Sequence, residues 1–334
     1  MTVEQQATPI LTVDNLKTYF SLREGWLKAV DGVSFTIDQC EIVGMVGESG
    51  CGKSVCAHSI LRLLKTPPAN LSGRIEFKGT DLLSVSNSEI RKIRGGHISM
   101  IFQDPMISLN PVLTIGRQIS ETMILHQDLS RAEARSRSVE LLEMVGIPGA
   151  EKRARQYIFQ LSGGMRQRVM IAMALSCQPE ILIADEPTTA LDVTIQAQIL
   201  ELIKEMNRKL GTAVLLITHD LGVVAGYTQR VMVVYAGKIV ETASTKTIFS
   251  RPWHPYTIGL MGAIPRMGKV RDGYLANIKG SPPSLIGLEK ACAFHSRCQY
   301  AMEECLNQVP EFVETEPGHF VRCFNPRFDR RQDL

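Results

Sequence analysis

The sequence has no long apolar run and little net charge. Its 37 Lys and Arg residues against 34 Asp and Glu give a formal net charge of only +3 over 334 residues. A dedicated nucleic-acid-binding protein usually has a pronounced basic face, so this balance argues against that class. The charge-rich stretches at residues 131–137 and 151–155 fit solvated helix faces better, because acids lie within or beside them.

The chain also lacks the features of a membrane-spanning or secreted protein. The apolar runs around Val169–Leu175 and Val231–Ala236 fall well short of the roughly 18 residues that a membrane-spanning helix needs. Residues 1–9 are polar and include Glu4, unlike a signal peptide. We therefore expect a cytosolic protein that reaches a membrane only through a partner.

A glycine-rich segment follows the first strongly apolar run. Residues 41–46 predict a buried strand, residues 47–54 match the P-loop pattern G-x-x-x-x-G-K-[ST], and residues 55–64 predict a helix. Backbone N–H groups and the positive end of the helix can then cradle phosphates. Lys53 is expected to reach the β- and γ-phosphates, and the Ser54 hydroxyl to bind Mg²⁺. The other predicted cradle residues are Gly47, Ser49, Gly50, Cys51 and Gly52.

Two later segments narrow the range of P-loop proteins. In residues 161–168 (LSGGMRQR), Ser162, Gly163 and Gly164 open a predicted helix and form a second potential anion site. Residues 181–186 then predict a buried strand that ends in two acids, Asp185 and Glu186. Two such acids are often only a solvated turn, and it is the upstream P-loop that favours a catalytic role.

Together these motifs resemble those of the ATP-binding cassette (ABC) ATPases over roughly residues 10–245. Alternating strands and helices independently indicate a mostly parallel, three-layer α/β core. The resemblance implies a P-loop NTPase fold with an antiparallel β subdomain and an ATPase domain at residues 1–245. A helical subdomain is expected at about residues 104–160, where Ser130 and Glu133 form a predicted capping box. Residues 246–334 are expected to form a C-terminal tail domain.

The resemblance also implies catalytic roles. Asp185 would bind Mg²⁺ directly or through water, and Glu186 would be the general base that aligns the attacking water. Gln103 resembles the glutamine that senses Mg²⁺ and the attacking water and touches the membrane subunit. His219 resembles the histidine that contacts the γ-phosphate. A lone Gln or His at a strand end is usually structural, so these two assignments depend on the surrounding motifs.

In this family two chains enclose two ATP molecules head to tail. The resemblance implies that Ser162 and Gly164 cap the γ-phosphate bound on a partner's P-loop, and that the loop at Asp192 crosses the dimer interface. An aromatic residue near the N-terminus stacks on adenine, and the register favours Phe20 over Tyr19. The chain is therefore expected to provide half of each of two active sites.

The tail resembles a particular branch of the family. Residues 254–257 (HPYT), 280–283 (GSPP) and 292–301 (CAFHSRCQYA) are similar to the dipeptide and oligopeptide importers, a branch that includes nickel importers. This implies a second, related ATPase, two membrane permeases and an extracytoplasmic binding protein as partners, at the cytoplasmic face of the cell membrane. Import of nickel or another metal chelate stays an alternative. A soluble ABC ATPase acting on nucleic acid or ribosomes is disfavoured, because such proteins commonly carry two cassettes and basic linkers.

Four of the eight cysteines crowd the tail, with intervals of five, six and seventeen residues: Cys292, Cys298, Cys305 and Cys323. Disulfides are disfavoured in a reducing compartment. Structural zinc sites usually use close cysteine pairs, and the wider spacing suits an iron–sulfur cluster better, although it does not match the ferredoxin run. Some members of the importer branch carry a [4Fe-4S] cluster here, which favours that reading over zinc or unligated thiols. His295 and His319 are expected to be structural.

Overall fold

The computed structural model of the protein describes residues 9–104, 108–189, 191–263, 278–288 and 290–326. The chain forms two compact units. The first, here called the helical unit, comprises Met1–Ile10, Ile37–Ile42 and Ser84–Ile217. The second, the P-loop unit, comprises Leu11–Thr36, Val43–Leu83 and Thr218–Leu334.

The helical unit contains parallel strands that are almost completely buried. These are β6 (Ile98–Ile101), β7 (Ile181–Asp185) and β8 (Ala213–Thr218). Residue Ile181 aligns with Ile98 on one side and with Ala213 on the other. Parallel strands covered on both faces appear in the sequence as continuous apolar runs, which is why residues 181–186 could be recognised as a strand.

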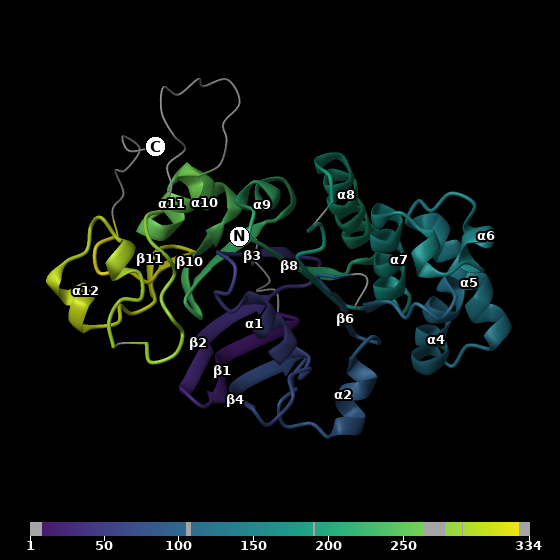
Figure 1. Cartoon of the computed structure of the whole chain (residues 1–334), viewed down its shortest axis with the longest axis horizontal. Helices are drawn as coiled ribbons and strands as arrows, with labels where there is room; N and C mark the ends of the chain where they lie inside the picture. The colour runs from purple at the N-terminus through teal and green to yellow at the C-terminus, as the bar shows by residue number, and fades with distance from the viewer. Residues whose placement is uncertain (1–8, 105–107, 190, 264–277, 289, 327–334) are drawn as a thin grey trace, which may run out of the picture. The chain divides into compact units, whose positions relative to one another are not determined.

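Helices make up the rest of this unit, and their ends follow local sequence signals. At the start of α5 the Ser130 hydroxyl accepts a hydrogen bond from the Glu133 N–H at 3.3 Å, and the Glu133 carboxylate accepts one from the Ser130 N–H at 2.9 Å, which confirms the predicted capping box. Gly211, in a left-handed conformation, ends α8. In Figure 1, α4, α5 and α6 lie together as a helical subdomain. The helices are α2 (Asn87–Ile93), α4 (Ile115–Gln127), α5 (Arg131–Met144), α6 (Ala150–Ala154), η1 (Ile158–Gln160), α7 (Gly163–Leu175) and α8 (Val193–Leu210).

The P-loop unit contains the expected antiparallel β subdomain. Its strands lie in the order β2-β1-β4-β5. Strand β1 runs antiparallel to β4, from the pair Leu11 and Phe77 to the pair Phe20 and Ala69. The strands are β1 (Leu11–Leu22), β2 (Gly25–Ile37), β4 (Ala69–Phe77) and β5 (Thr80–Asp81).

A second, mixed group of strands in this unit includes the strand that leads into the P-loop. Strand β3 pairs in parallel with β9, which pairs antiparallel with β10. The tail then adds β12 to β10, with Glu241 opposite Val321, and β11 to β12. The tail strands therefore satisfy the backbone groups along the free edge of β10. The strands are β3 (Ile42–Val46), β9 (Arg230–Tyr235), β10 (Lys238–Ser244), β11 (Val313–Glu316) and β12 (His319–Val321).

Short helices complete the P-loop unit: α1 (Lys53–Ile60), α9 (Leu221–Tyr227), α10 (Thr245–Ser250), α11 (Pro255–Gly262), η2 (His295–Arg297) and α12 (Glu303–Asn307). Because β12 shares a sheet with β10, the separate tail domain at residues 246–334 stays a prediction. Among the described residues, no helix is long and apolar enough to cross a membrane.

Candidate nucleotide-binding site

The P-loop connects β3 to α1, and two of its glycines are required by the close approach of neighbouring backbone. A Cβ atom on Gly47 would lie 2.2 Å from the carbonyl oxygen of Val234, and one on Gly52 would lie 2.1 Å from that of Ala29. Gly52 also has a φ of +104°, a conformation that side chains rarely adopt. At these positions any side chain would push the loop off the strands that support it.

Lys53 lies inside the loop with its ammonium group against the backbone. Its Nζ donates to the carbonyl oxygens of Gly47 at 2.8 Å and Glu48 at 2.9 Å. Ser54, the predicted magnesium ligand, is the second residue of α1. Burial raises the pKa of the neighbouring Cys51 thiol, against the opposing effect of Lys53, so this thiol stays protonated at neutral pH. The loop thus places a cation where the motif predicts phosphate binding.

Tail residues also contact the loop, which no sequence pattern indicated. The Glu48 carboxylate forms an ion pair with Arg297 at 2.6 Å, and the Glu48 N–H donates to the Tyr256 hydroxyl at 2.8 Å. Arg297 lies in the tail segment at residues 292–301, which the sequence analysis used only for its resemblance to the importers. The sequence offered no reason to connect this arginine to Glu48.

In the helical unit, the two predicted acids lie at the end of β7. Asp185 is its last residue and is buried. Glu186 follows with a φ of +46°, and its N–H donates to the carbonyl of Ile217 at 2.9 Å. Left-handed backbone is uncommon at residues other than glycine, and the residues that adopt it cluster at functional sites.

Gln103 and Glu186 are brought together by the fold. Gln103 Nε2 donates to Glu186 Oε2 at 3.1 Å, across 83 residues of sequence. The hydroxyl of Thr189 donates to the same oxygen at 2.8 Å. The structure therefore joins two residues that the motifs predicted separately, and it adds Thr189, which the sequence analysis missed.

The Ser-Gly-Gly segment opens α7 as predicted. Ser162 is the N-cap residue and is exposed, and within the described residues its side chain makes no capping hydrogen bond. A Cβ atom on Gly164 would lie 2.9 Å from the Ile195 side chain of α8. Asp192 caps α8 by accepting a hydrogen bond from the Ile195 N–H at 2.9 Å. The neighbouring Ala190 lies outside the described residues.

The remaining predicted nucleotide contacts belong to the P-loop unit. His219 is exposed and directly follows β8. The Tyr19 hydroxyl donates to Asp31, and burial together with this bond raises the pKa of Tyr19. Since successive side chains of a strand point to opposite faces, Phe20 points away from Asp31. The roles of Phe20 and His219 stay predictions.

All four tail cysteines line one small cavity in the P-loop unit, together with His254, Phe294 and His295. Burial, and then the proximity of the other three thiols, raises the pKa of Cys292 to about 11. Among the described residues, however, no group of three or more His, Cys, Asp or Glu side chains has the arrangement of a metal site. The four cysteine sulfurs therefore line one cavity, but among the described residues they do not adopt the geometry of a metal site.

The two tail histidines have structural partners, as expected. His295 Nδ1 lies 2.7 Å from the Cys292 carbonyl oxygen, and His319 Nε2 lies 2.8 Å from Glu241 Oε1. Both members of the second pair are buried.

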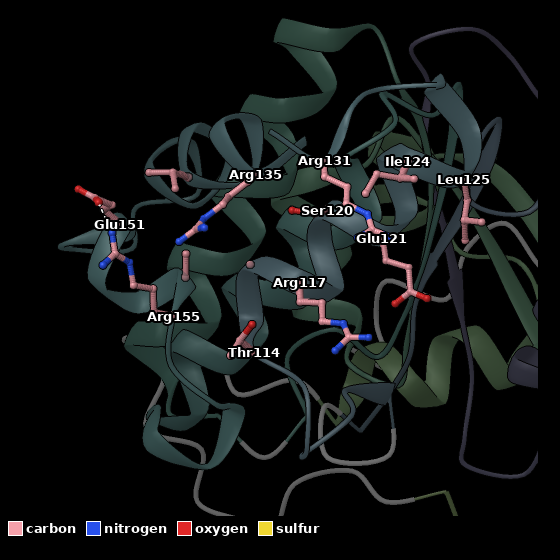
Figure 2. Close-up of a pocket in the computed structure, with 13 residues that line it drawn as sticks. Thr114, Arg117, Ser120, Glu121, Ile124, Leu125, Arg131, Arg135, Glu151 and Arg155 are labelled. Carbon is pink, nitrogen blue, oxygen red and sulfur yellow. Dashed lines mark hydrogen bonds and ion pairs between the residues drawn. The ribbon is translucent and has the colours of Figure 1, made fainter. Parts of the chain in front are cut away.

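The helical subdomain contains a basic groove of about 830 Å³ among α4, α5 and α6 (Figure 2). Arg155 is paired with Glu151 at 2.6 Å, and the apolar side chain of Leu125, at the other end of the groove in Figure 2, is exposed. The charged stretches at residues 131–137 and 151–155 thus line this groove, together with the acids Glu121 and Glu151. Its arginines are Arg117, Arg131, Arg135 and Arg155.

Comparison with known proteins places these motifs in a family. Residues 30–189 match the ABC transporter family, and residues 240–305 match the family described as the oligopeptide/dipeptide transporter C-terminal region. The chain is 51% identical over 320 residues to the probable peptide ABC transporter ATP-binding protein y4tR of Sinorhizobium fredii, which covers 96% of each chain. The chain belongs to the ABC transporter ATPase family.

Further sequence relatives match most of the chain, and a solved structure matches its fold over 70% of the chain. The oligopeptide transport ATP-binding protein AppD of Bacillus subtilis is 51% identical, over 94% of this chain and 96% of its own. The oligopeptide transport ATP-binding protein OppD of Escherichia coli is 46% identical, over 97% and 95%. The dimeric post-hydrolysis structure of the ATP-binding cassette MJ0796 with ADP and Pi matches with a TM-score of 0.64 at 30% identity, covering 70% of this chain and 98% of that one. ATP and Mg²⁺ are accordingly the expected ligands of this ABC ATPase.

Proposed function

We propose that this ABC ATPase powers an importer of dipeptides or oligopeptides across the cytoplasmic membrane. The observation that carries the proposal is the match of residues 240–305 to the oligopeptide/dipeptide transporter C-terminal region, joined to the ABC match at residues 30–189 in one chain. Near-full-length relatives carry peptide-transport names. An importer of nickel or another metal chelate is the alternative, because an ATPase subunit does not contact the cargo.

The P-loop unit would bind the triphosphate. Lys53 would leave the carbonyl oxygens of Gly47 and Glu48 and bind the oxygens of the β- and γ-phosphates. The backbone N–H groups of the loop would donate hydrogen bonds to the same phosphate oxygens. Mg²⁺ would be held by Ser54, Asp185 and Gln103 and would neutralise charge on the phosphates. Phe20 would stack on adenine and His219 would contact the γ-phosphate.

Glu186 would align the attacking water and accept its proton as the γ-phosphoryl group is transferred. Hydrogen bonds from Gln103 and Thr189 hold its carboxylate in one orientation. Most of the acceleration would come from this positioning and from charge neutralisation, as expected for phosphoryl transfer.

The variant Glu186→Gln tests the assignment. It keeps the shape of the side chain but not its basicity, so we expect ATP to bind while turnover falls by about a hundredfold or more. Glu180→Gln is the matched control, since Glu180 lies just before the other end of β7 and pairs with His97 at 3.0 Å. Undiminished hydrolysis by the Glu186 variant within the assembled transporter would reject the base assignment.

Ser162, Gly163, Gly164 and Asp192 would complete the site of a second cassette. The exposed Ser162 hydroxyl and the first-turn N–H groups of α7 support this, because they form an anion site beyond the chain's own P-loop. The partner would be a related ATPase, giving a heterodimer with two shared ATP sites.

The assembly would be held at the cytoplasmic face of the membrane by two permeases, which an extracytoplasmic binding protein supplies. The basic groove of the helical subdomain would suit an acidic cytoplasmic segment of a permease. Affinity purification from gently solubilised membranes should recover two integral membrane proteins and a second ATPase. Recovery with ribosomes or nucleic acid instead would favour a soluble ABC ATPase and refute the importer.

The four-cysteine cavity would hold a [4Fe-4S] cluster, with zinc as the second choice. Cationic metal would stabilise the thiolates, which burial and mutual repulsion disfavour at Cys292. The test is anaerobic purification followed by iron, sulfide and zinc analysis and an absorbance scan. A colourless, metal-free protein would overturn both assignments.

A further inference from the structure

Glu48, the second residue of the P-loop, is held by a buried arginine of the tail. Arg297 Nη1 lies 2.6 Å from Glu48 Oε2, and Nη2 lies 2.9 Å from Oε1, across 249 residues of sequence. The Arg297 side chain is only 3% exposed. Paired bonds of this kind, from a planar guanidinium to a carboxylate, fix both groups in distance and direction.

Further contacts immobilise each side of this pair. Arg297 Nε donates to the carbonyl of Lys279 at 3.1 Å, and its guanidinium carbon lies 5.8 Å from the centre of the Tyr235 ring. On the loop side, the Glu48 N–H donates at 2.8 Å to the hydroxyl of Tyr256, a fully buried residue of α11. The tail therefore holds both the side chain and the backbone of Glu48.

The position of Glu48 matters for the phosphate site. Its carbonyl oxygen accepts a hydrogen bond from Lys53 at 2.9 Å, so the backbone of Glu48 helps to place the cation that the phosphates require. Its carboxylate, in turn, is a negative charge within a loop built to bind a polyanion. Without a cation beside it, that carboxylate would repel the triphosphate.

We propose that Arg297 is a positioning residue for nucleotide binding: it neutralises Glu48 and thereby connects the tail to the P-loop. The tail then contributes directly to the affinity of the ATP site. Cys298 directly follows Arg297, so the cysteine-lined cavity and this contact share one short segment.

A charge-deletion cycle in the full-length chain tests the proposal, with titration of the Mg²⁺ complex of trinitrophenyl-ATP as the measurement. Arg297→Met leaves Glu48 uncompensated and should raise Kd about tenfold. The double variant Glu48→Gln/Arg297→Met carries neither charge and should return to within about threefold of the wild type, a recovery that loss of a merely structural contact would not produce. Arg297→Lys should give an intermediate Kd, because it keeps the charge without the paired geometry.

The tail offers a matched control. Arg251 forms a similar paired bridge to Glu316, at 3.2 and 2.9 Å, away from the P-loop. Arg251→Met should therefore leave Kd unchanged. The proposal is overturned if Arg297→Met binds as the wild type does, or if the double variant binds as weakly as Arg297→Met. Should Arg297→Met fail to fold, the comparison of Arg297→Lys with the wild type decides, and equal Kd values would refute the proposal. A wild-type chain that bound no nucleotide would instead overturn the ATP site itself.

Discussion

Two glycines of the P-loop allow a controlled test of the claim that close backbone approach excludes a side chain at Gly52 but not at Gly50. Gly50 and Gly52 both have positive φ angles, of +77° and +104°. A Cβ atom on Gly50 would meet no heavy atom within 4 Å in the described part of the chain, whereas one on Gly52 would lie 2.1 Å from the carbonyl oxygen of Ala29. Gly50→Ala and Gly52→Ala therefore add the same methyl group in similar backbone conformations but in different surroundings.

The expected cost follows from these contacts. Left-handed backbone costs alanine about 1 kcal/mol relative to glycine, and this applies to both variants. At Gly52 the loop and β2 would also have to separate by about 1.3 Å to restore an ordinary 3.4 Å contact. Because the obstructing atom is backbone, it cannot rotate aside, and we add about 2 kcal/mol for overpacking. The free energy of unfolding should fall by about 1 kcal/mol in Gly50→Ala and about 3 kcal/mol in Gly52→Ala.

Urea unfolding followed by tryptophan fluorescence is the appropriate assay. The chain has two tryptophans, and both belong to the P-loop unit: Trp26 in β2, half exposed, and Trp253, fully buried. Fluorescence therefore reports on the unit that contains the mutations. Comparable slopes against urea would justify direct comparison of the two midpoints. Equal destabilisation within about 0.5 kcal/mol, or a larger loss at Gly50, would refute the steric argument.

Two further predictions concern acidic side chains of the P-loop unit. Glu241 is fully buried, lies 2.8 Å from His319 Nε2 and accepts hydrogen bonds from the consecutive backbone N–H groups of Trp253 and His254 at 2.7 and 2.9 Å. Glu241→Ala should therefore lower the free energy of unfolding by about 3–5 kcal/mol. A loss below about 1 kcal/mol in urea unfolding would contradict this. For Asp31, burial alone would raise the pKa, but hydrogen bonds from Lys238 and Tyr19 outweigh it and lower the pKa. The stability that this ionised carboxylate contributes is present above its unfolded-state pKa and disappears as the pH falls through its folded-state pKa. The wild type should therefore lose more stability than Asp31→Asn between pH 7 and about pH 3. Parallel curves of unfolding free energy against pH would show that the ion pair contributes nothing.

Local sequence patterns predicted the elements whose signals lie within a few residues. The P-loop follows its strand directly, and the capping box at Ser130 and Glu133 spans one helical turn. Buried parallel strands such as β7 are recognisable because both faces are covered and the apolar run is continuous. Each of these features depends on backbone preferences and on a burial pattern that are set by residues close together in the sequence.

Contacts between distant segments were not predictable in the same way. Gln103 and Glu186 were both expected in the site. Nothing in residues 186–189, however, indicates that Thr189 and Gln103 will donate to the same oxygen of Glu186. The tail likewise offered cysteine spacing but no sign that Val321 would pair with β10. Such pairings depend on chain closure over tens or hundreds of residues, which a single sequence does not record locally.

The sequence by itself therefore determined the local features of this protein: a P-loop motif between a strand and a helix, a strand ending in two acids and a Ser-Gly-Gly helix start, each written in contiguous residues. Tertiary structure alone decided how those parts are supported. It placed Gln103 beside Glu186, and it placed Arg297 against Glu48, because a charged side chain taken out of water must find a partner in space, wherever along the chain that partner lies.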